Sequence, residues 1–231
     1  MERLNKYLSR AGACSRREAD RAILAGEVLV NGRPAELGQQ VSEEDVVEYR
    51  GRVIRAEDEP VMLALYKPAG IVCTTAQDEP DNIVDFLNYP TRVYPVGRLD
   101  KDSEGLILMT NMGEAVNGIL RNRYNKEKEY LVRVDKPVTI EFLTAMRSGV
   151  RILDTVTKPC RVEKLSKDRF RIVLTQGLNR QIRRMCEALD YRVRELKRVR
   201  ILNITLDGLA PGEWRKIEGE ELKELLGGEN D

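Results

Sequence analysis

The N-terminal part of the chain carries an apolar pattern typical of two short helices and a strand. Apolar residues at positions i, i+3, i+4 and i+7 form the buried stripe of the first helix, at Leu4, Tyr7, Leu8 and Ala11. Ser15 with Glu18 three residues later is a capping-box pattern that begins a second helix, and Gly26 is placed to end it. Residues 28–30 then form a strand ahead of an Asn-Gly turn at 31–32. The pattern therefore predicts a small helix-helix-strand unit.

Beyond this unit the apolar pattern alternates between strands and helices. Strand-like runs lie at 61–66, 130–134, 161–165, 170–174 and 201–206. Helical patterns lie at 82–88, 113–123, 138–147, 179–189 and 219–226. Because several strands follow one another without an intervening helix, we expect an α+β fold with a mixed, largely antiparallel sheet. The segment 50–60 turns acidic and ends in proline, which predicts two domains, 1–58 and 59–231.

Composition and charge narrow the class of protein. The 231 residues are 42% hydrophobic and 33% charged, enough for one small and one medium domain with packed cores. The net charge is only +1, so basic residues matter where they cluster locally. No apolar run is long enough to cross a bilayer, and the start of the chain has no apolar signal segment. We therefore expect a cytoplasmic protein without membrane contact.

The chain contains no histidine, which limits the chemistry it can perform. Ser-His-Asp and Cys-His nucleophiles and H-E-x-x-H metal sites are excluded. The four cysteines are far apart and form no C-x-x-C pair, so we expect free thiols. The glycine-rich loops that hold ATP or dinucleotides are absent as well. These observations favour chemistry without a metal or cofactor, carried by Asp, Glu, Tyr, Lys or Cys.

The segment 96–111 is the strongest candidate for chemistry. It reads Val-Gly-Arg-Leu-Asp-Lys-Asp-Ser-Glu-Gly, followed by the apolar run Leu-Ile-Leu-Met-Thr-Asn. Gly97 and Gly105 bracket an acidic turn and permit close approach or a positive φ. Arg98 precedes Asp100 by two residues, so on an extended backbone both side chains share one face. A guanidinium there would keep the carboxylate ionised.

Basic residues gather on the predicted helices. In the helix at 179–189 the apolar stripe is Ile182, Met185, Cys186 and Leu189, whereas Arg180, Arg183 and Arg184 lie off it. A basic strand with Arg192, Arg194, Lys197, Arg198 and Arg200 follows. The N-terminal helices add Arg3, Lys6, Arg10, Arg16, Arg17 and Arg21. Basic residues near a helix start oppose the helix dipole, so phosphate binding explains them better than local stability does.

Four segments together resemble the ribosomal RNA pseudouridine synthases of the RsuA/RluB/RluF type. The segment 96–111 resembles the catalytic motif of this family, 128–132 its tyrosine strand and 176–186 its arginine helix. Residues 1 to about 50 resemble the small RNA-binding fold of ribosomal protein S4 that this branch carries in front of its catalytic domain. The resemblance covers nearly the full chain, is strongest to the RluF-like large-subunit branch, and implies a catalytic domain of the pseudouridine synthase type.

The resemblance implies a role for each motif residue. Asp100 would be the nucleophile, Tyr130 would stack on the flipped base and move a proton, and Arg183 would pair with the carboxylate. Asp102 and Glu104 are rivals to Asp100 that the sequence alone does not eliminate. The expected RNA contacts are Arg98, Asn179, Arg180, Gln181 and Arg184, with Arg3, Lys6, Arg10, Ser15, Arg16, Arg17 and Arg21 in the N-terminal domain.

The resemblance also implies the partner. We expect a monomer that isomerises a uridine in a stem-loop of large-subunit ribosomal RNA, with a transfer RNA as a second target, without metal or cofactor. The alternative is a non-catalytic RNA-binding ribosome assembly factor, which would not need Asp100, Tyr130 and Arg183 together. A methyltransferase is disfavoured because its glycine-rich cofactor loop is missing. Relatives often have glycine where Asp190 stands, so we expect left-handed backbone there, at a cost of about 1 kcal/mol.

Overall fold

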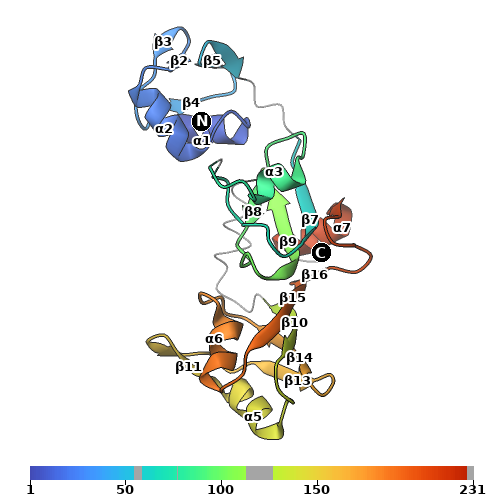
Figure 1. Ribbon diagram of the computed structural model, residues 1–231. Helices are drawn as coiled ribbons and strands as arrows, with labels where there is room; N and C mark the ends of the chain where they lie inside the picture. Colours follow the sequence, from blue (N-terminus) through green and yellow to red (C-terminus); the bar gives the residue numbers. More distant parts are fainter. Residues whose placement is uncertain (55–58, 77, 113–126, 228–231) are drawn as a thin grey trace. The chain divides into compact units, whose positions relative to one another are not determined.

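A computed structural model describes residues 1–54, 59–76, 78–112 and 127–227. The chain divides into two compact units, the first built mainly from Met1–Val61 and the second mainly from the residues that follow (Figure 1). The predicted boundary at residue 58 and the predicted helix at 113–123 lie outside the described residues. No helix in the described part of the chain has the length and apolar content that a bilayer crossing needs.

The first unit has the predicted order of two helices, a strand and a turn. Its elements are β1 (Glu2–Arg3), α1 (Leu4–Arg10), α2 (Arg16–Leu24), β2 (Val28–Val30), β3 (Arg33–Pro34), β4 (Gln40–Val41), β5 (Val47–Tyr49) and β6 (Arg52–Ile54). The Ser15 hydroxyl accepts a hydrogen bond from the Glu18 amide at 3.2 Å, which confirms the predicted helix start. Asn31 and Gly32 both have positive φ, 52° and 76°, as the predicted tight turn requires.

The second unit is a nine-stranded mixed sheet with helices, which confirms the predicted fold class. Its strands are β7 (Met62–Lys67), β8 (Tyr94–Val96), β9 (Glu104–Thr110), β10 (Lys128–Val134), β13 (Arg161–Lys164), β14 (Arg169–Leu174), β15 (Val193–Ile201), β16 (Ile204–Thr205) and β17 (Trp214–Lys216). The sheet order is β13-β14-β10-β15-β9-β7-β17, with β16 beside β15 and β8 beside β9. The pairing of β15 with β9 is parallel and the other pairings are antiparallel.

Helices and a small hairpin complete this unit. They are α3 (Ile83–Leu87), α5 (Ile140–Ser148), α6 (Gln181–Ala188), α7 (Gly219–Leu226) and the hairpin of β11 (Arg151–Ile152) with β12 (Thr155–Val156). Apolar residues of α5 and α6 share one core with the inward-facing residues of β10, β13, β14 and β15, including Phe142, Met185 and Phe170. Both helices therefore cover the same face of this part of the sheet (Figure 1).

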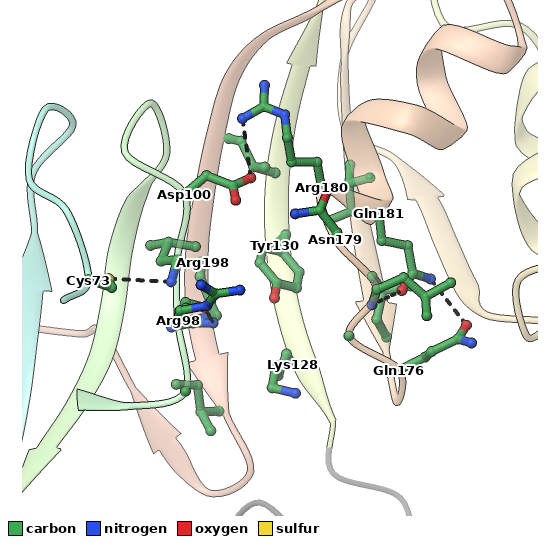
Figure 2. A pocket seen from close by; sticks show the side chains of 18 of the residues that line it. Cys73, Arg98, Asp100, Lys128, Tyr130, Gln176, Asn179, Arg180, Gln181 and Arg198 are labelled. Atoms are coloured by element: carbon green, nitrogen blue, oxygen red, sulfur yellow. Dashed lines mark hydrogen bonds and ion pairs between the residues drawn. The ribbon is translucent and has the colours of Figure 1, made fainter. Parts of the chain in front are cut away.

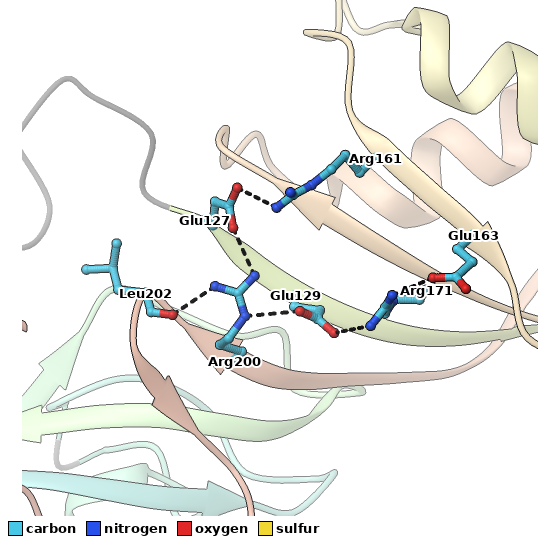
Figure 3. A network of polar contacts seen from close by, with 7 residues as sticks. All are labelled: Glu127, Glu129, Arg161, Glu163, Arg171, Arg200 and Leu202. Carbon is cyan, nitrogen blue, oxygen red and sulfur yellow. Dashed lines mark hydrogen bonds and ion pairs between the residues drawn. The ribbon is translucent and has the colours of Figure 1, made fainter. Parts of the chain in front are cut away.

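The opposite face of these strands carries charged residues that neutralise one another. Arg200 donates to Glu127 at 2.9 Å and to Glu129 at 3.0 Å, and Glu129 also accepts from Arg171. Arg161 and Glu163 extend this network at its two ends (Figure 3). In the predicted basic strand, Arg200 is thus paired with carboxylates and is not free to bind RNA.

One boundary differs from the sequence-based expectation. The predicted strand at 201–206 is correct only in part: Ile201 is the last residue of β15, the chain turns at Leu202 with a φ of 52°, and β16 covers Ile204–Thr205. The preceding basic segment, also predicted as a strand, forms β15, whose buried residues include Leu196, Arg198 and Ile201. The left-handed backbone expected at Asp190 is confirmed, with a φ of 63°.

The parallel contact of β15 with β9 depends on a glycine. Gly105 has a φ of 111° and lies opposite Arg198 in the ladder. A Cβ atom at this position would lie 2.2 Å from the carbonyl oxygen of Arg198, a backbone atom that cannot move independently. The glycine expected from the sequence to permit close approach therefore does so at a strand junction, next to the acidic turn.

Candidate active site

A pocket of about 530 Å³ lies within the second unit. It is lined by the acidic turn around Asp100, by Tyr130 of β10, by Arg198 of β15 and by residues 176–182 at the start of α6. Figure 2 shows Tyr130 between the acidic turn and the α6 start, so that segments far apart in the sequence face one cavity. Residues singled out by the sequence therefore share a pocket large enough for a small ligand.

Asp100 is partly accessible and is held by its own turn. Its side chain is 31% exposed, and its carbonyl oxygen accepts from the Ser103 amide at 3.1 Å. The next carbonyl oxygen, that of Lys101, accepts from the Gly70 amide at 2.7 Å. On the other side, the Leu99 amide donates to the Cys73 sulfur at 3.4 Å. The turn is thus fixed by backbone contacts on both sides of the carboxylate.

Two arginines, Arg180 at the N-cap of α6 and Arg183 within it, bind the Asp100 turn. Their partners differ from the sequence-based prediction. Arg180, which has left-handed backbone, donates to both oxygens of Asp102 at 3.1 Å and lies 3.7 Å from Asp100. Arg183 donates to the Asp102 carbonyl at 3.0 Å and to the Ser103 hydroxyl at 3.1 Å. Hydrogen bonds from Arg180 and the charge of Arg183 hold the pKa of Asp102 below its usual value.

This geometry corrects one expectation. Arg183 was expected to pair with Asp100, yet it holds the turn through Asp102 and Ser103, and Arg180 is the arginine within ion-pair distance of Asp100. Arg98 and Asp100 were expected to share a face, and both line the pocket, although the segment that holds them is not a strand. Arg98 is exposed at the pocket, and its carbonyl oxygen accepts from Arg198 at 3.3 Å.

Lys67 is a functional candidate that the sequence analysis did not single out. Its side chain is fully buried, and Nζ donates to the carbonyl oxygens of Pro68 at 2.8 Å, Ile71 at 2.9 Å and Lys101 at 3.5 Å. Burial holds the pKa of Lys67 below its usual value, while the nearby acidic residues oppose that effect. Lys67 therefore helps to position the Asp100 turn through the carbonyl oxygen of Lys101. Its sequence signal was only a lysine at the end of an apolar strand.

Tyr130 lies in the pocket as expected. It packs partly against the core on which α6 rests, and its neighbour on β15 is Arg198. Directly opposed residues of an antiparallel pair point to the same face, so Tyr130 and Arg198 both face the cavity. Figure 2 shows the two side chains with Arg98 close to them.

Gln181 and Arg184 of α6 bond mainly to the turn that precedes the helix, at residues 176–179. Gln181 is buried, accepts from the Leu178 amide at 3.0 Å and donates to Gln176 at 3.4 Å. Arg184 donates twice to Asn179, at 3.1 Å to its carbonyl and at 3.2 Å to its side-chain oxygen. The polar atoms of Gln181 are thus used within the protein, which disagrees with its expected role as an RNA contact.

The candidates in the first unit fall into two groups. Arg3, Arg16, Arg17 and Arg21 are exposed. Arg10 and Lys6, by contrast, both lie against Glu2, which offsets part of their charge. Ser15, expected at the RNA, uses its hydroxyl to begin α2. The exposed arginines of α2 are therefore the stronger candidates for phosphate contacts.

The cysteines are free thiols, as predicted. Burial raises the pKa of Cys186 to about 12 and that of Cys160 to about 11, so neither is a ready nucleophile. Burial also raises the pKa of Cys73, the cysteine that lines the pocket. Among the residues that the structure describes, no cluster of three or more carboxylates or thiols could hold a metal ion.

Comparison with known proteins identifies the family. The RNA pseudouridylate synthase model matches residues 61–188 and the S4 domain model matches residues 2–47. The chain is 56% identical over 226 residues to the dual-specificity RNA pseudouridine synthase RluF of Escherichia coli (strain K12), covering 97% of this chain and 78% of that protein. It is 38% identical to the ribosomal large subunit pseudouridine synthase B of Bacillus subtilis (strain 168), and the match covers 97% of this chain and 96% of that protein.

A solved structure agrees over the same length. The crystal structure of a pseudouridylate synthase matches with a TM-score of 0.71 and 30% identity, covering 97% of this chain and all of that one. The family model for the catalytic part spans more than half of the present chain, and it contains Asp100, Tyr130 and Arg183. The chain therefore belongs to the RNA pseudouridine synthases, in the branch with an N-terminal S4 domain.

Proposed function

We propose that this enzyme isomerises one specific uridine of large-subunit ribosomal RNA to pseudouridine, with Asp100 as the nucleophile. The carboxylate adds to the anomeric carbon of the ribose as the bond to base nitrogen 1 breaks. The base turns over, and its carbon 5 bonds to the anomeric carbon as the bond from Asp100 breaks, which frees the carboxylate again. The proton on carbon 5 leaves and nitrogen 1 gains one, so the atoms of substrate and product are the same.

The observation that carries this proposal is the position of Asp100. Of the three acidic residues in its turn, Asp100 lines the pocket, whereas both oxygens of Asp102 are bound by Arg180. Glu104 begins β9 and is not a lining residue of the pocket. A nucleophile needs a free carboxylate oxygen beside the substrate, so Asp100 is favoured over its two rivals.

The surrounding residues suit a base flipped out of RNA. A flipped base needs an apolar or aromatic surface on which to stack, and Tyr130 offers one across the cavity from Asp100. A phenol is a weak base at neutral pH, so proton transfer from carbon 5 by Tyr130 requires help from the charge that develops in the pocket. Arg180 and Arg183 orient the Asp100 turn during the reaction.

The RNA is proposed to contact both domains, 1–58 and 59–231. Exposed arginines of α2 would bind phosphates, while exposed Arg98 at the pocket would help to displace the target base. A stem-loop suits the site, since looped RNA yields a base at lower cost than a continuous duplex does. The relative from Escherichia coli is called a dual-specificity synthase, which supports a second RNA target, and we propose a transfer RNA for it.

The test compares three carboxylate variants. Asp100→Asn should abolish pseudouridine formation while RNA affinity stays within a few fold, and Asp102→Asn and Glu104→Gln should retain turnover. Carbodiimide mapping of total RNA, with and without the gene, then locates the uridine. Turnover by Asp100→Asn would refute the nucleophile assignment. An unchanged modification map after gene deletion would refute the cellular target.

A further inference from the structure

The pocket contains a buried cation whose hydrogen-bonding capacity is not used up by the protein. Arg198 is only 3% exposed. Its Nε donates to the Leu106 carbonyl at 2.7 Å and its Nη1 to the Arg98 carbonyl at 3.3 Å. Its Nη2 is buried and has no partner in the described part of the chain. Burying an arginine without a carboxylate partner and with an unused donor costs free energy, so a ligand is the natural partner.

An irregularity in the sheet places this cation. The pairing of β10 with β15 shifts between Glu129, opposite Arg200, and Tyr130, opposite Arg198. The extra residue, Val199, has no partner on β10 at this point. Without the shift Val199 would lie opposite Tyr130. The β-bulge therefore puts a guanidinium, and not an apolar side chain, on the Tyr130 side of the sheet, a use typical of bulges near active sites.

The same bulge places two arginines of β15, Arg198 and Arg200, on opposite faces of the sheet. Arg200 is on the outer face, where its charge is matched by Glu127 and Glu129 (Figure 3). Arg198 lines the pocket, where backbone carbonyls hold its guanidinium but do not neutralise it (Figure 2). The neutral acceptors fix the guanidinium in place while leaving its full charge available to whatever enters the cavity.

From this geometry we propose that Arg198 is a catalytic residue that binds the target base itself. Its guanidinium faces the base from the lining of the pocket and stabilises the negative charge that the base carries after detachment. This inference rests on the proposed function. When the bond between nitrogen 1 and the sugar breaks, its electron pair stays with the base, and the charge spreads onto the two ring carbonyl oxygens. When carbon 5 bonds to the sugar, the electron pair of the base enters that bond and the Asp100 carboxylate leaves with its charge. Loss of the carbon 5 proton then returns an electron pair to the ring, and nitrogen 1 takes up a proton.

The base is a better ligand for Arg198 than an RNA phosphate is. Arg198 is on the same face as Tyr130, the residue proposed to stack on the base, and it is almost completely buried. A backbone phosphate stays attached to the hydrated strand and suits cations nearer the rim, such as Arg180, whose side chain is 41% exposed. A charge that appears only during the reaction gains most from a fixed, water-excluded donor.

The test varies the base as well as the residue. Single-turnover rates are measured for wild type, Arg198→Gln and Arg198→Lys, with RNA that contains uridine or 5-fluorouridine at the target, following loss of the nitrogen-linked nucleoside. Fluorine withdraws electrons, so the detached fluorinated base holds its negative charge more easily and depends less on Arg198. Arg198→Gln should lose about 10²- to 10³-fold with uridine and about tenfold or less with 5-fluorouridine.

Three control variants distinguish charge stabilisation by Arg198 from a structural role of this residue. They also test the Asp100 nucleophile independently. Arg198→Lys keeps a charge and donors, so it should recover part of the uridine rate. Arg200→Gln, on the same strand but the outer face, should leave the ratio of the two rates at the wild-type value. Asp100→Asn tests the nucleophile and should lose both rates. Equal losses of both rates in Arg198→Gln and Arg198→Lys, or a change in RNA affinity alone, would overturn the assignment of Arg198.

Discussion

Arg180 joins two segments distant in sequence by binding both carboxylate oxygens of Asp102 at 3.1 Å. The same guanidinium is 3.7 Å from Asp100. A bidentate arginine fixes direction as well as distance, so Asp102 anchors Arg180 beside the carboxylate that lines the pocket. Asp102 is therefore a positioning residue that anchors Arg180, whereas Asp100 is the residue proposed for the chemistry.

Arg180→Gln should lower kcat by about 10- to 100-fold, because Asp100 loses the cation that orients it. Arg184→Gln is the matched control on the same helix. Arg184 bonds only to Asn179 among the described residues, so its removal should leave kcat unchanged at saturating RNA. Steady-state kinetics with a stem-loop RNA measure both. Equal kcat losses in Arg180→Gln and Arg184→Gln would contradict a specific role of Arg180 in orienting Asp100.

Asp102→Asn should change the pH dependence of stability. The folded-state pKa of Asp102 is lowered, so its stabilising contribution is present above the unfolded value of about 3.8 and is lost as the pH falls through the lowered value. The side chain is half exposed, so the effect is under about 1 kcal/mol. Urea unfolding at pH 7 should show the variant less stable, with the difference shrinking below pH 4. A constant difference would contradict the assigned shift.

Gly105→Ala should destabilise the catalytic domain severely, by more than about 4 kcal/mol, or prevent folding. The added methyl group would meet the Arg198 carbonyl across the parallel strand pair. Gly208→Ala is the control, since Gly208 also has positive φ, 79°, but open space around the missing Cβ. It should cost only about 1 kcal/mol. Thermal and urea unfolding of the two variants give the comparison, and similar losses would refute the close-approach explanation.

Tyr130→Phe should reduce kcat by about 100-fold or more with little change in RNA affinity, since the ring still stacks but the hydroxyl is gone. Tyr191→Phe is a suitable control, because the Tyr191 hydroxyl donates to the Pro137 carbonyl at 3.0 Å and the residue does not line this pocket. Rapid-quench single-turnover assays isolate the chemical steps. A wild-type rate in Tyr130→Phe would leave the phenol without a part in proton transfer.

Replacing Arg16 and Arg17 together with glutamine should weaken RNA binding and flatten its salt dependence. Each lost phosphate contact lowers the slope of log K against log salt by about 0.7 to 0.9, so a change of up to about 2 is expected. Arg10→Gln should have a smaller effect, because Glu2 already offsets its charge. Binding titrations at several salt concentrations provide the slopes. An unaltered slope in the double variant would exclude these arginines as phosphate contacts.

Local sequence determined much of the fold. The capping pattern at Ser15, the positive φ at Asn31 and the helix at 179–189 follow from interactions between near neighbours, which the sequence displays directly. The acidic turn could be chosen as the chemical site for the same reason, since its motif is continuous. The separate roles of the cations on β15 could not be predicted, because Arg200 pairs with glutamates that are remote in sequence while Arg198 lines the pocket.

The sequence by itself determined the class of fold, the family and the segment that holds the reactive carboxylate. Tertiary structure decided which cation faces which acid: Arg180, and not Arg98 or Arg183, approaches Asp100, while Arg198 turns into the pocket. Periodicity along one strand cannot reveal a register shift, and the face of every later residue depends on that shift. Contacts between distant segments, and the burial they create, exist only once the sheet has assembled.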